Sequence, residues 1–318
     1  MKLIDLHVHL DGSIPLSTAR ELAERQGLPL YSETELRRRM VAPPDCRDLN
    51  EYLAVFDYPL SLIQTEEAIE YAVYAFLKML ADQGLTAAEP RFAPSLLTHG
   101  GLTQQQALEA ALRGREHFLS SQDNVSNLKA AFILCTMRGP QETNEKSNFE
   151  TIELTKAYLG KGVCAADLAG AEALFPTKDY QALFARAAAL DIPYTIHAGE
   201  AAGPDSIRAA LSFGACRIGH GVRCLEDPAL VQEMAKTQIP LELCPTSNLH
   251  TRIFGKMEDY PIRPLLEAGV CITVNTDNMT VSDTTLSKEF ARIAEALQLT
   301  ETELSVLEQN AEKAQFNR

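Results

Sequence analysis

Short runs of apolar and β-branched residues recur along the whole chain of 318 residues, and longer segments with apolar residues at helical spacing separate them. Strands that alternate with helices are typical of parallel sheets with right-handed crossovers, and eight such strands close into a barrel. The sequence therefore predicts an α/β fold, a (β/α)8 TIM barrel. A doubly wound open sheet is the alternative, because periodicity does not report whether a sheet closes. The predicted strands are Leu3 to His9, Leu85 to Phe92, Leu128 to Cys135, Val163 to Leu168, Ile192 to His197, Cys216 to His220, Ile239 to Leu243 and Val270 to Asn275.

Apolar spacings of three and four residues predict helices between these strands. Thr65, Thr103 and Asp227 are the expected N-caps of three of them. The predicted helices are Leu49 to Leu60, Glu66 to Asp82, Thr103 to Ser120, Asn148 to Leu159, Tyr180 to Leu190, Pro228 to Lys236 and Glu303 to Phe316.

The chain shows no linker, repeat or domain boundary, so we expect residues 1–318 to form a single domain. Residues 13–84, between the first two strands, form a much longer connection than a barrel usually has, and contain several predicted helices. Long insertions at the carboxyl end of a barrel commonly cover an active site. We therefore expect a helical lid in this segment.

Charge and composition exclude several classes of protein. The 29 Lys and Arg residues against 43 Asp and Glu give a net charge of −14, which would repel polymeric nucleic acid. The seven cysteines are odd in number and form no CxxC, so we expect reduced thiols packed in a core. There is no apolar run of 18 residues, and the first residues do not resemble a secretory segment, so we expect a soluble cytoplasmic protein without membrane contact.

Five polar residues stand at the ends of predicted strands. His7 and His9 lie two residues apart on the first strand, so both side chains point to the same face. His197, His220 and Asp277 end later strands in the runs TIHAGE, RIGHG and VNTDN. A buried histidine alone is usually explained by a core hydrogen bond, and Asp277 alone by a helix cap. Because the carboxyl ends of barrel strands meet at one face, the five together indicate a functional site.

Neutral imidazoles and a carboxylate suit a divalent ion, of which zinc is the best match. Three histidines and one aspartate would leave a position for water, whose pKa zinc lowers to about 7. The predicted strand Val163 to Leu168 has no lysine to bridge a second metal, so we expect one zinc ion per subunit. Glu200 follows His197 by three residues and is expected to donate a proton; the alternative is a first-turn glutamate favoured by the helix dipole.

These motifs resemble the adenosine deaminase family of amidohydrolase barrels. The matching runs are LHVHLDGS, FDYPL, AEPRFAP, ILCTMR, DLAGAE, HAGE, RIGHG, CPTSN and VNTDN, in this order over nearly the whole chain. The resemblance implies zinc ligands at His7, His9, His197 and Asp277. It also implies that Glu200 gives a proton to purine N1, and that His220 orients the attacking hydroxide and helps to deprotonate it.

The resemblance further implies contacts with the substrate. The N–H of Gly170 in DLAGAE would bind N3, and Leu53 and Phe56 would belong to the lid, although ordinary packing of an amphipathic helix explains these two equally well. Asn278 stands where many family members carry a second aspartate, and its amide can donate to N7 at any pH. Asp11 would accept a hydrogen bond from the ribose 5′-hydroxyl. Relatives that act on free adenine tend to have glutamate there, so Asp11 favours a nucleoside and disfavours a 5′-phosphate.

The sequence thus predicts a zinc-dependent hydrolase that converts adenosine and 2′-deoxyadenosine to inosine and 2′-deoxyinosine with release of ammonia. Deamination of another 6-aminopurine, adenine or aminofutalosine, is one alternative. A binding barrel that has lost catalysis is another, against which the presence of Glu200 and His220 argues. The unrelated zinc deaminase pattern with P-C-x-x-C is absent, because CPTSN has a single cysteine.

Overall fold

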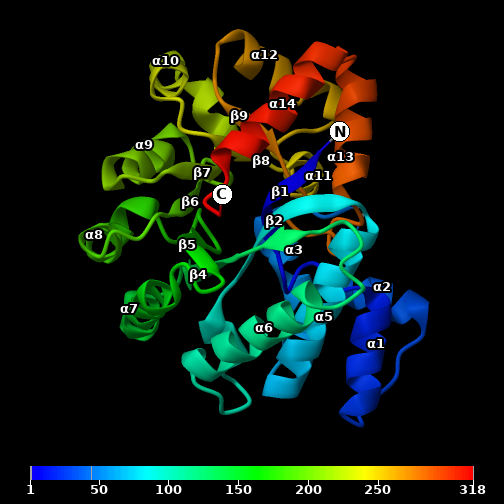
Figure 1. Ribbon diagram of the computed structural model, residues 1–318. Helices are drawn as coiled ribbons and strands as arrows, with labels where there is room; N and C mark the ends of the chain where they lie inside the picture. The colour runs from blue at the N-terminus through cyan, green and yellow to red at the C-terminus, as the bar shows by residue number, and fades with distance from the viewer. Residues whose placement is uncertain (1, 44, 318) are drawn as a thin grey trace.

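A computed structural model describes residues 2–43 and 45–317 of the chain. Parallel strands gather at the centre of the molecule, and helices surround them (Figure 1). The strands are β1 (Leu3–His9), β2 (Leu85–Phe92), β3 (Lys129–Ala130), β4 (Phe132–Met137), β5 (Val163–Ala169), β6 (Thr195–Ala198), β7 (Arg217–His220), β8 (Leu241–Leu243) and β9 (Ile272–Val274).

The strands form two parallel sheets, β1-β2-β4-β5 and β6-β7-β8-β9, which join at two seams. At the first seam Ala166 pairs with Tyr194. At the second Val8 pairs with Asp277, where the His9 N–H donates to the Asp277 carbonyl at 2.6 Å. With both seams paired the sheet closes on itself, so the predicted barrel is confirmed and the open doubly wound sheet is wrong.

The first two strands keep their predicted bounds, four others shift by one or two residues at one end or both, and two differ further. The strand predicted from Leu128 to Cys135 is divided into β3 and β4. Both pair with β2, so together they occupy one strand position of the barrel. The strand predicted from Ile192 begins at Thr195. Pro193 has no N–H for a ladder, and only its carbonyl is bonded, by the Ala166 N–H at 3.0 Å.

The N-caps predicted at Thr65, Thr103 and Asp227 are confirmed, because each side chain accepts a backbone N–H of its own helix. The helix predicted from Asn148 begins earlier, at Gln141. The helices are α1 (Leu16–Arg25), α2 (Glu33–Met40), α3 (Leu49–Leu53), α4 (Asp57–Leu62), α5 (Glu66–Asp82), α6 (Gln104–Leu119), α7 (Gln141–Tyr158), α8 (Gln181–Ala189), α9 (Pro204–Phe213), α10 (Pro228–Thr237), α11 (Pro245–His250), α12 (Ile262–Glu267), α13 (Leu286–Leu297) and α14 (Glu301–Ala314).

The connection between β1 and β2 contains α1 to α5. The last of them, α5, packs along α6 and so belongs to the outer ring of helices. The single helix predicted from Leu49 to Leu60 is instead α3, a 3-10 turn (Ala54–Phe56) and α4. Pro59 gives the physical reason: in one long helix its missing N–H would interrupt the interior, whereas it now lies in the first turn of α4.

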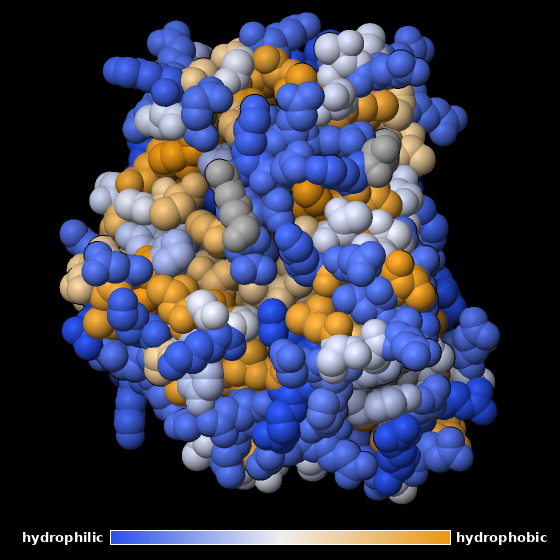
Figure 2. Space-filling view, viewed as in Figure 1, coloured by the Kyte–Doolittle hydropathy of each residue, from blue (hydrophilic) through white to orange (hydrophobic). Residues whose placement is uncertain are grey.

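The last helix, α14, packs against β1 and β9 at the amino end of the barrel, and the chain then passes over the barrel centre (Figure 1). On this face hydrophobic residues form patches separated by hydrophilic ones (Figure 2). Of the cysteines expected in the core, Cys216 is exposed and Cys271 is half-buried. Among the described residues no helix has both the length and the apolar character needed to cross a membrane.

Candidate active site

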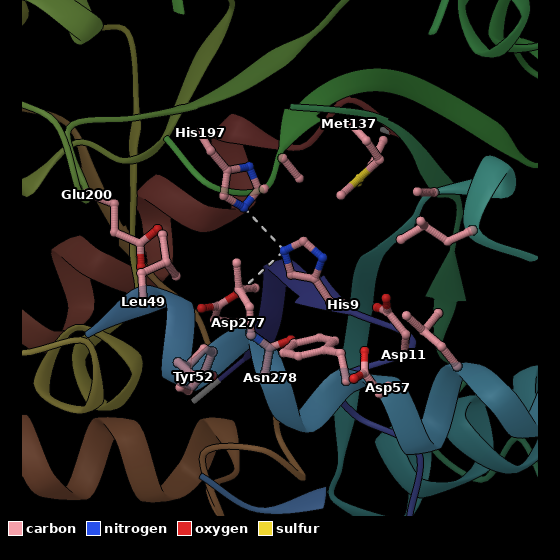
Figure 3. A pocket seen from close by; sticks show the side chains of 18 of the residues that line it. His9, Asp11, Leu49, Tyr52, Asp57, Met137, His197, Glu200, Asp277 and Asn278 are labelled. Carbon is pink, nitrogen blue, oxygen red and sulfur yellow. Dashed lines mark hydrogen bonds and ion pairs between the residues drawn. The ribbon is translucent and has the colours of Figure 1, made fainter. Parts of the chain in front are cut away.

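The five polar residues predicted to meet do so at the carboxyl end of the barrel. Ligand atoms of His7, His197, His220 and Asp277 all lie within 4.8 Å of one another. The Nε2 atom of His9 lies 3.2 Å from His197 Nε2 and 3.4 Å from Asp277 Oδ1 (Figure 3). All five side chains therefore point into one small volume.

The distances between these atoms match a tetrahedral metal centre. The Asp277 Oδ1 atom lies 3.4 Å from both His7 Nε2 and His9 Nε2. Ligands bound at about 2.0–2.1 Å in a tetrahedron are roughly 3.3 Å apart. His7 Nε2 is also buried and makes no hydrogen bond, which leaves its lone pair free for an ion.

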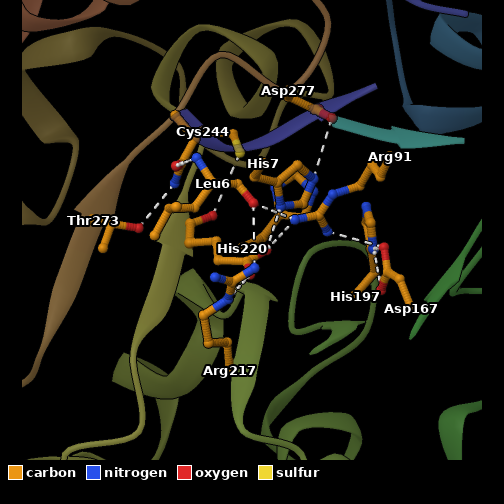
Figure 4. Close-up of polar contacts among 12 residues, drawn as sticks. Leu6, His7, Arg91, Asp167, His197, Arg217, His220, Cys244, Thr273 and Asp277 are labelled. Carbon is orange, nitrogen blue, oxygen red and sulfur yellow. Dashed lines mark hydrogen bonds and ion pairs between the residues drawn. The ribbon is translucent and has the colours of Figure 1, made fainter. Parts of the chain in front are cut away.

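Buried carboxylates orient two of these histidines from behind. His7 Nδ1 lies 2.7 Å from Glu242 Oε2, and His197 Nδ1 lies 2.9 Å from Asp167 Oδ2. The guanidinium of Arg91 bridges the two carboxylates at 2.9 Å from each (Figure 4). These partners hold each ring with Nε2 toward the site, an arrangement common around protein metal ions.

The charges of this network do not balance. Arg91 and Arg217 are fully buried, and Arg217 lies 2.6 Å from both Glu89 and Glu242. Asp167 pairs with Arg91, and Asp277 lies against the histidines, so the network holds four buried carboxylates and two guanidinium groups. Because unpaired buried charge is costly, a divalent cation among the histidines would complete the balance.

Glu200 and His220 face the same volume from the ends of β6 and β7. Glu200 Oε2 lies 3.7 Å from His220 Nε2, and Asn248 holds the other ring nitrogen of His220 at 3.0 Å. Burial, helped by the nearby charge of Asp277, raises the pKa of Glu200 well above its usual value. Burial also lowers the pKa of His220, so its ring is neutral at pH 7.

The backbone is strained at two of these positions. His220 has φ 57° and Asp277 has φ 60°, in the left-handed region that residues with a side chain rarely adopt. Such strain persists where the surroundings fix it, and it is concentrated at functional sites.

A pocket of about 870 Å³, including its open mouth, extends outward from the histidines. Figure 3 shows Leu49 and Tyr52, on α3, across the pocket from the strand ends. The pocket lining is mostly apolar, and it includes every residue that the sequence predicted to contact the substrate. The lining residues are His9, Asp11, Leu49, Tyr52, Leu53, Phe56, Asp57, Leu60, Ala93, Leu96, Cys135, Met137, Ala169, Gly170, His197, Glu200, His220, Asp277 and Asn278.

Two of the polar lining residues, Asp11 and Asn278, lie beside Gly12, whose N–H donates to Asp11 Oδ1 at 3.2 Å. Asn278 Oδ1 is buried without a hydrogen-bond partner. It lies so close to Gly12 that a Cβ on Gly12 would be 1.9 Å away, which explains the glycine in HLDGS. Burial raises the pKa of Asp11 to about 6.

Sequence reasoning missed the groups that support the histidines. Asp167, Glu242, Arg91 and Arg217 were not predicted, and neither was the wall residue Tyr52. A signal was present for two of them, because Asp167 and Glu242 stand inside strands that are otherwise apolar, VCAADLA and LEL. A charge at such a position needs a buried partner, and the sequence does not name it.

The chain is similar to known proteins over almost its whole length. The sequence model of the family described as adenosine deaminase matches residues 3–318. The chain is 47% identical to an adenosine deaminase from Haemophilus ducreyi, over 99% of this chain and 91% of that protein. It is 39% identical to an adenosine deaminase from Enterococcus faecalis, over 97% and 90% of the two chains. A crystal structure of an adenine deaminase from Arthrobacter aurescens superposes with a TM-score of 0.87 at 26% identity, over 99% of this chain and 94% of that one. The chain belongs to the adenosine deaminase family.

Proposed function

We propose that the protein is a zinc-dependent adenosine deaminase, which hydrolyses adenosine and 2′-deoxyadenosine to inosine and 2′-deoxyinosine with release of ammonia. The observation that carries the proposal is the meeting of four histidines and Asp277 with a buried carboxyl group, Glu200, at one end of an apolar pocket. The relatives of 47% and 39% identity bear the same activity in their names.

His7, His9, His197 and Asp277 are the residues that would hold one zinc ion. The unpartnered His7 Nε2, the spacing of the ligand atoms and the two uncompensated negative charges all support this assignment. When bound, zinc lowers the pKa of a coordinated water to about 7, so that hydroxide is available at neutral pH.

Glu200 holds a proton for purine N1. Its buried carboxyl group has a raised pKa, which favours the protonated form that a proton donor needs. Attack at C6 interrupts the aromatic delocalisation of the purine ring and is therefore unfavourable. Protonation of N1 draws electrons away from C6 and so makes the attack easier. His220 lies on the other side of the cluster from His9, with the His7 and His197 rings between them. Its Nδ1 accepts from the Asn248 amide, so the neutral ring carries its proton on Nε2 and orients the attacking water by donating to it.

Three polar groups orient the substrate. The backbone N–H of Gly170 binds N3, the amide of Asn278 donates to N7, and Asp11 accepts from the ribose 5′-hydroxyl. Gly170 has φ 106°, a conformation that glycine adopts without strain. A 5′-phosphate would meet the negative charge of Asp11 above pH 6.

Leu53 and Phe56 supply part of the apolar wall, and we propose that residues 13–84 act as a helical lid on a single domain of residues 1–318. A closed wall excludes water and strengthens the polar contacts inside. The partner is a small purine nucleoside, with neither nucleic acid polymer nor membrane, and the site of action is the cytoplasm. The net charge of −14 supports the exclusion of nucleic acid.

The test is product analysis with purified protein and adenosine, 2′-deoxyadenosine, adenine or aminofutalosine, before and after chelation and after zinc is restored. We expect the two nucleosides to be deaminated, activity to be lost on chelation, and zinc to restore it. Turnover of adenine or aminofutalosine with adenosine untouched would assign the alternative activity. Adenine is the more pertinent of the two, because the adenine deaminase from Arthrobacter aurescens shares the fold at 26% identity.

A further inference from the structure

The side chain of Glu172, in the run DLAGAE, is 1% exposed and accepts five hydrogen bonds. Four come from consecutive backbone N–H groups, those of residues 199 to 202, at distances of 2.7 to 3.0 Å. The fifth comes from the Ser206 hydroxyl at 2.5 Å. One carboxylate therefore satisfies the whole turn that follows β6, the turn that carries Glu200.

This contact joins two loops. Glu172 follows β5 and stands two residues after Gly170, whereas its five donors follow β6. Gly170 and Glu200 both line the pocket. In the proposed function they face N3 and N1, which belong to the same six-membered ring of the purine. The separation of the two loops therefore decides whether both contacts form together.

Each hydrogen bond in the chain that leads from Glu172 to Arg138 can be assigned a donor and an acceptor. Ser206 uses its only proton toward Glu172, so it must accept from Thr177, whose oxygen is 2.6 Å away. Thr177 in turn accepts from the Arg138 guanidinium at 2.8 Å, and Arg138 also donates to the His197 carbonyl at 2.6 Å. The network thus runs from the backbone of a predicted zinc ligand to the turn of the predicted proton donor.

We propose that Glu172 is a positioning residue for deamination, because its carboxylate holds the Glu200 turn at a fixed distance from Gly170 so that N1 and N3 of one ring are met together. This inference rests on the proposed function. Glu172 does not line the pocket, and it acts through the backbone of residues 199 to 202.

The Glu172→Gln variant is the first test. It keeps the shape, but its amide group turns two N–H donors toward backbone donors and removes the charge. We expect kcat to fall about tenfold to a hundredfold, as for a misplaced catalytic group, and KM to change less than about threefold. Zinc content should remain that of the wild type. Hydrogen exchange measured by mass spectrometry should quicken in the peptide that contains residues 199 to 202.

The Glu172→Asp variant separates an acceptor role from simple filling of space. Aspartate keeps the charge and both acceptor oxygens but is one methylene shorter, whereas glutamine keeps the volume. A positioning role predicts that Asp retains more of the wild-type kcat than Gln. A space-filling role predicts the reverse order, and that order would overturn the proposal.

Two further variants calibrate the effect. Ser206→Ala removes one of the five bonds to Glu172 and leaves the four backbone bonds in place, so its kcat should fall less than that of Glu172→Gln. Glu289→Gln makes the same chemical change at another buried glutamate that accepts a backbone N–H, from Thr246 at 3.1 Å, and does not line the pocket. It should not quicken exchange in residues 199 to 202.

The outcomes distinguish this inference from the proposed function. Wild-type protein that leaves adenosine untouched contradicts the proposed function, and the exchange experiment still decides whether Glu172 holds the turn. Adenosine turnover in the wild type with unchanged kcat in Glu172→Gln overturns the positioning role alone. Loss of zinc from Glu172→Gln, or a rise in KM at constant kcat, overturns it as well.

Discussion

The two walls of the pocket are built in opposite ways. At the strand ends, His7, His197 and Asp277 are 0%, 6% and 4% exposed. Each of them lies within 3.4 Å of another buried polar or charged group. On the facing segment, Leu53 and Phe56 are half-buried and bring no polar group to the pocket. The strand ends thus have geometry fixed by charge and hydrogen bonds, whereas the helical segment supplies mainly apolar surface, with Asp57 exposed and the Tyr52 hydroxyl bonded to Ser282. Changes to the first wall should therefore act on the metal and on kcat, and changes to the second on KM.

The largest effect should come from Asp277→Ala, which removes a ligand and leaves the facing histidines without their carboxylate. We expect loss of bound zinc and a fall in kcat/KM of more than about a thousandfold. Elemental analysis and the adenosine assay measure the two effects. Asp259→Ala, at an exposed aspartate, is the matched control and should keep both zinc and activity. Full zinc content in Asp277→Ala would remove this residue from the ligand set.

Glu200→Gln should lower kcat about a hundredfold to ten-thousandfold, because the amide cannot pass a proton to N1. Zinc content should not change, since Glu200 is not one of the proposed ligands. Glu226→Gln, at a partly exposed glutamate paired with Arg223, is the control and should behave as the wild type. Turnover retained by Glu200→Gln would exclude Glu200 as the proton donor.

For the apolar wall, Leu53→Ala and Phe56→Ala should each raise KM for adenosine about tenfold, because they remove apolar contact with the substrate. We expect kcat to stay within a few-fold and zinc content to be unchanged, in contrast to the two variants above. Leu28→Ala, at an exposed leucine that does not line the pocket, should leave KM unchanged. A fall in kcat at constant KM would show that the two walls are not separate in function.

Asn278 lies where the two walls meet, and Asn278→Asp should lower kcat/KM by about tenfold or less if both side chains can donate to N7. An aspartate donates only when protonated, so activity of the variant should fall further as the pH rises, whereas the wild-type amide shows no such dependence. The pH profile of kcat/KM is the measurement. If Asn278→Asp shows no activity above background at any pH, the two side chains are not equivalent as donors to N7.

The smallest effect concerns Asp11, whose pKa is raised to about 6 by burial. Above that pH the ionised carboxylate is the stronger acceptor for the 5′-hydroxyl, and below it the group is protonated and neutral. KM for adenosine should therefore rise about fivefold as the pH falls below 6. KM for 5′-deoxyadenosine, which lacks the hydroxyl, should not rise as the pH falls below 6. An equal rise in KM with both substrates would show that another group titrates.

Much of this architecture could be predicted because it depends on local sequence patterns. Alternating strands and helices, the caps at Thr65, Thr103 and Asp227, and polar residues at strand ends are all local patterns, and each was found by sequence alone. The break in the helix at Pro59 had a local signal too, which the apolar spacing concealed.

Other features depended on tertiary structure. Closure of the barrel depends on the pairing of Val8 with Asp277, residues far apart in the chain. The partner of His7, Glu242, lies 235 positions away, and the five donors of Glu172 come from a different loop. The sequence alone determined which residues bring chemistry to the barrel mouth, because strand ends and residue types are local properties. Only the folded chain decided which buried charge meets which, because such pairs form where the barrel brings side-chain atoms from distant parts of the chain within about 3 Å of each other.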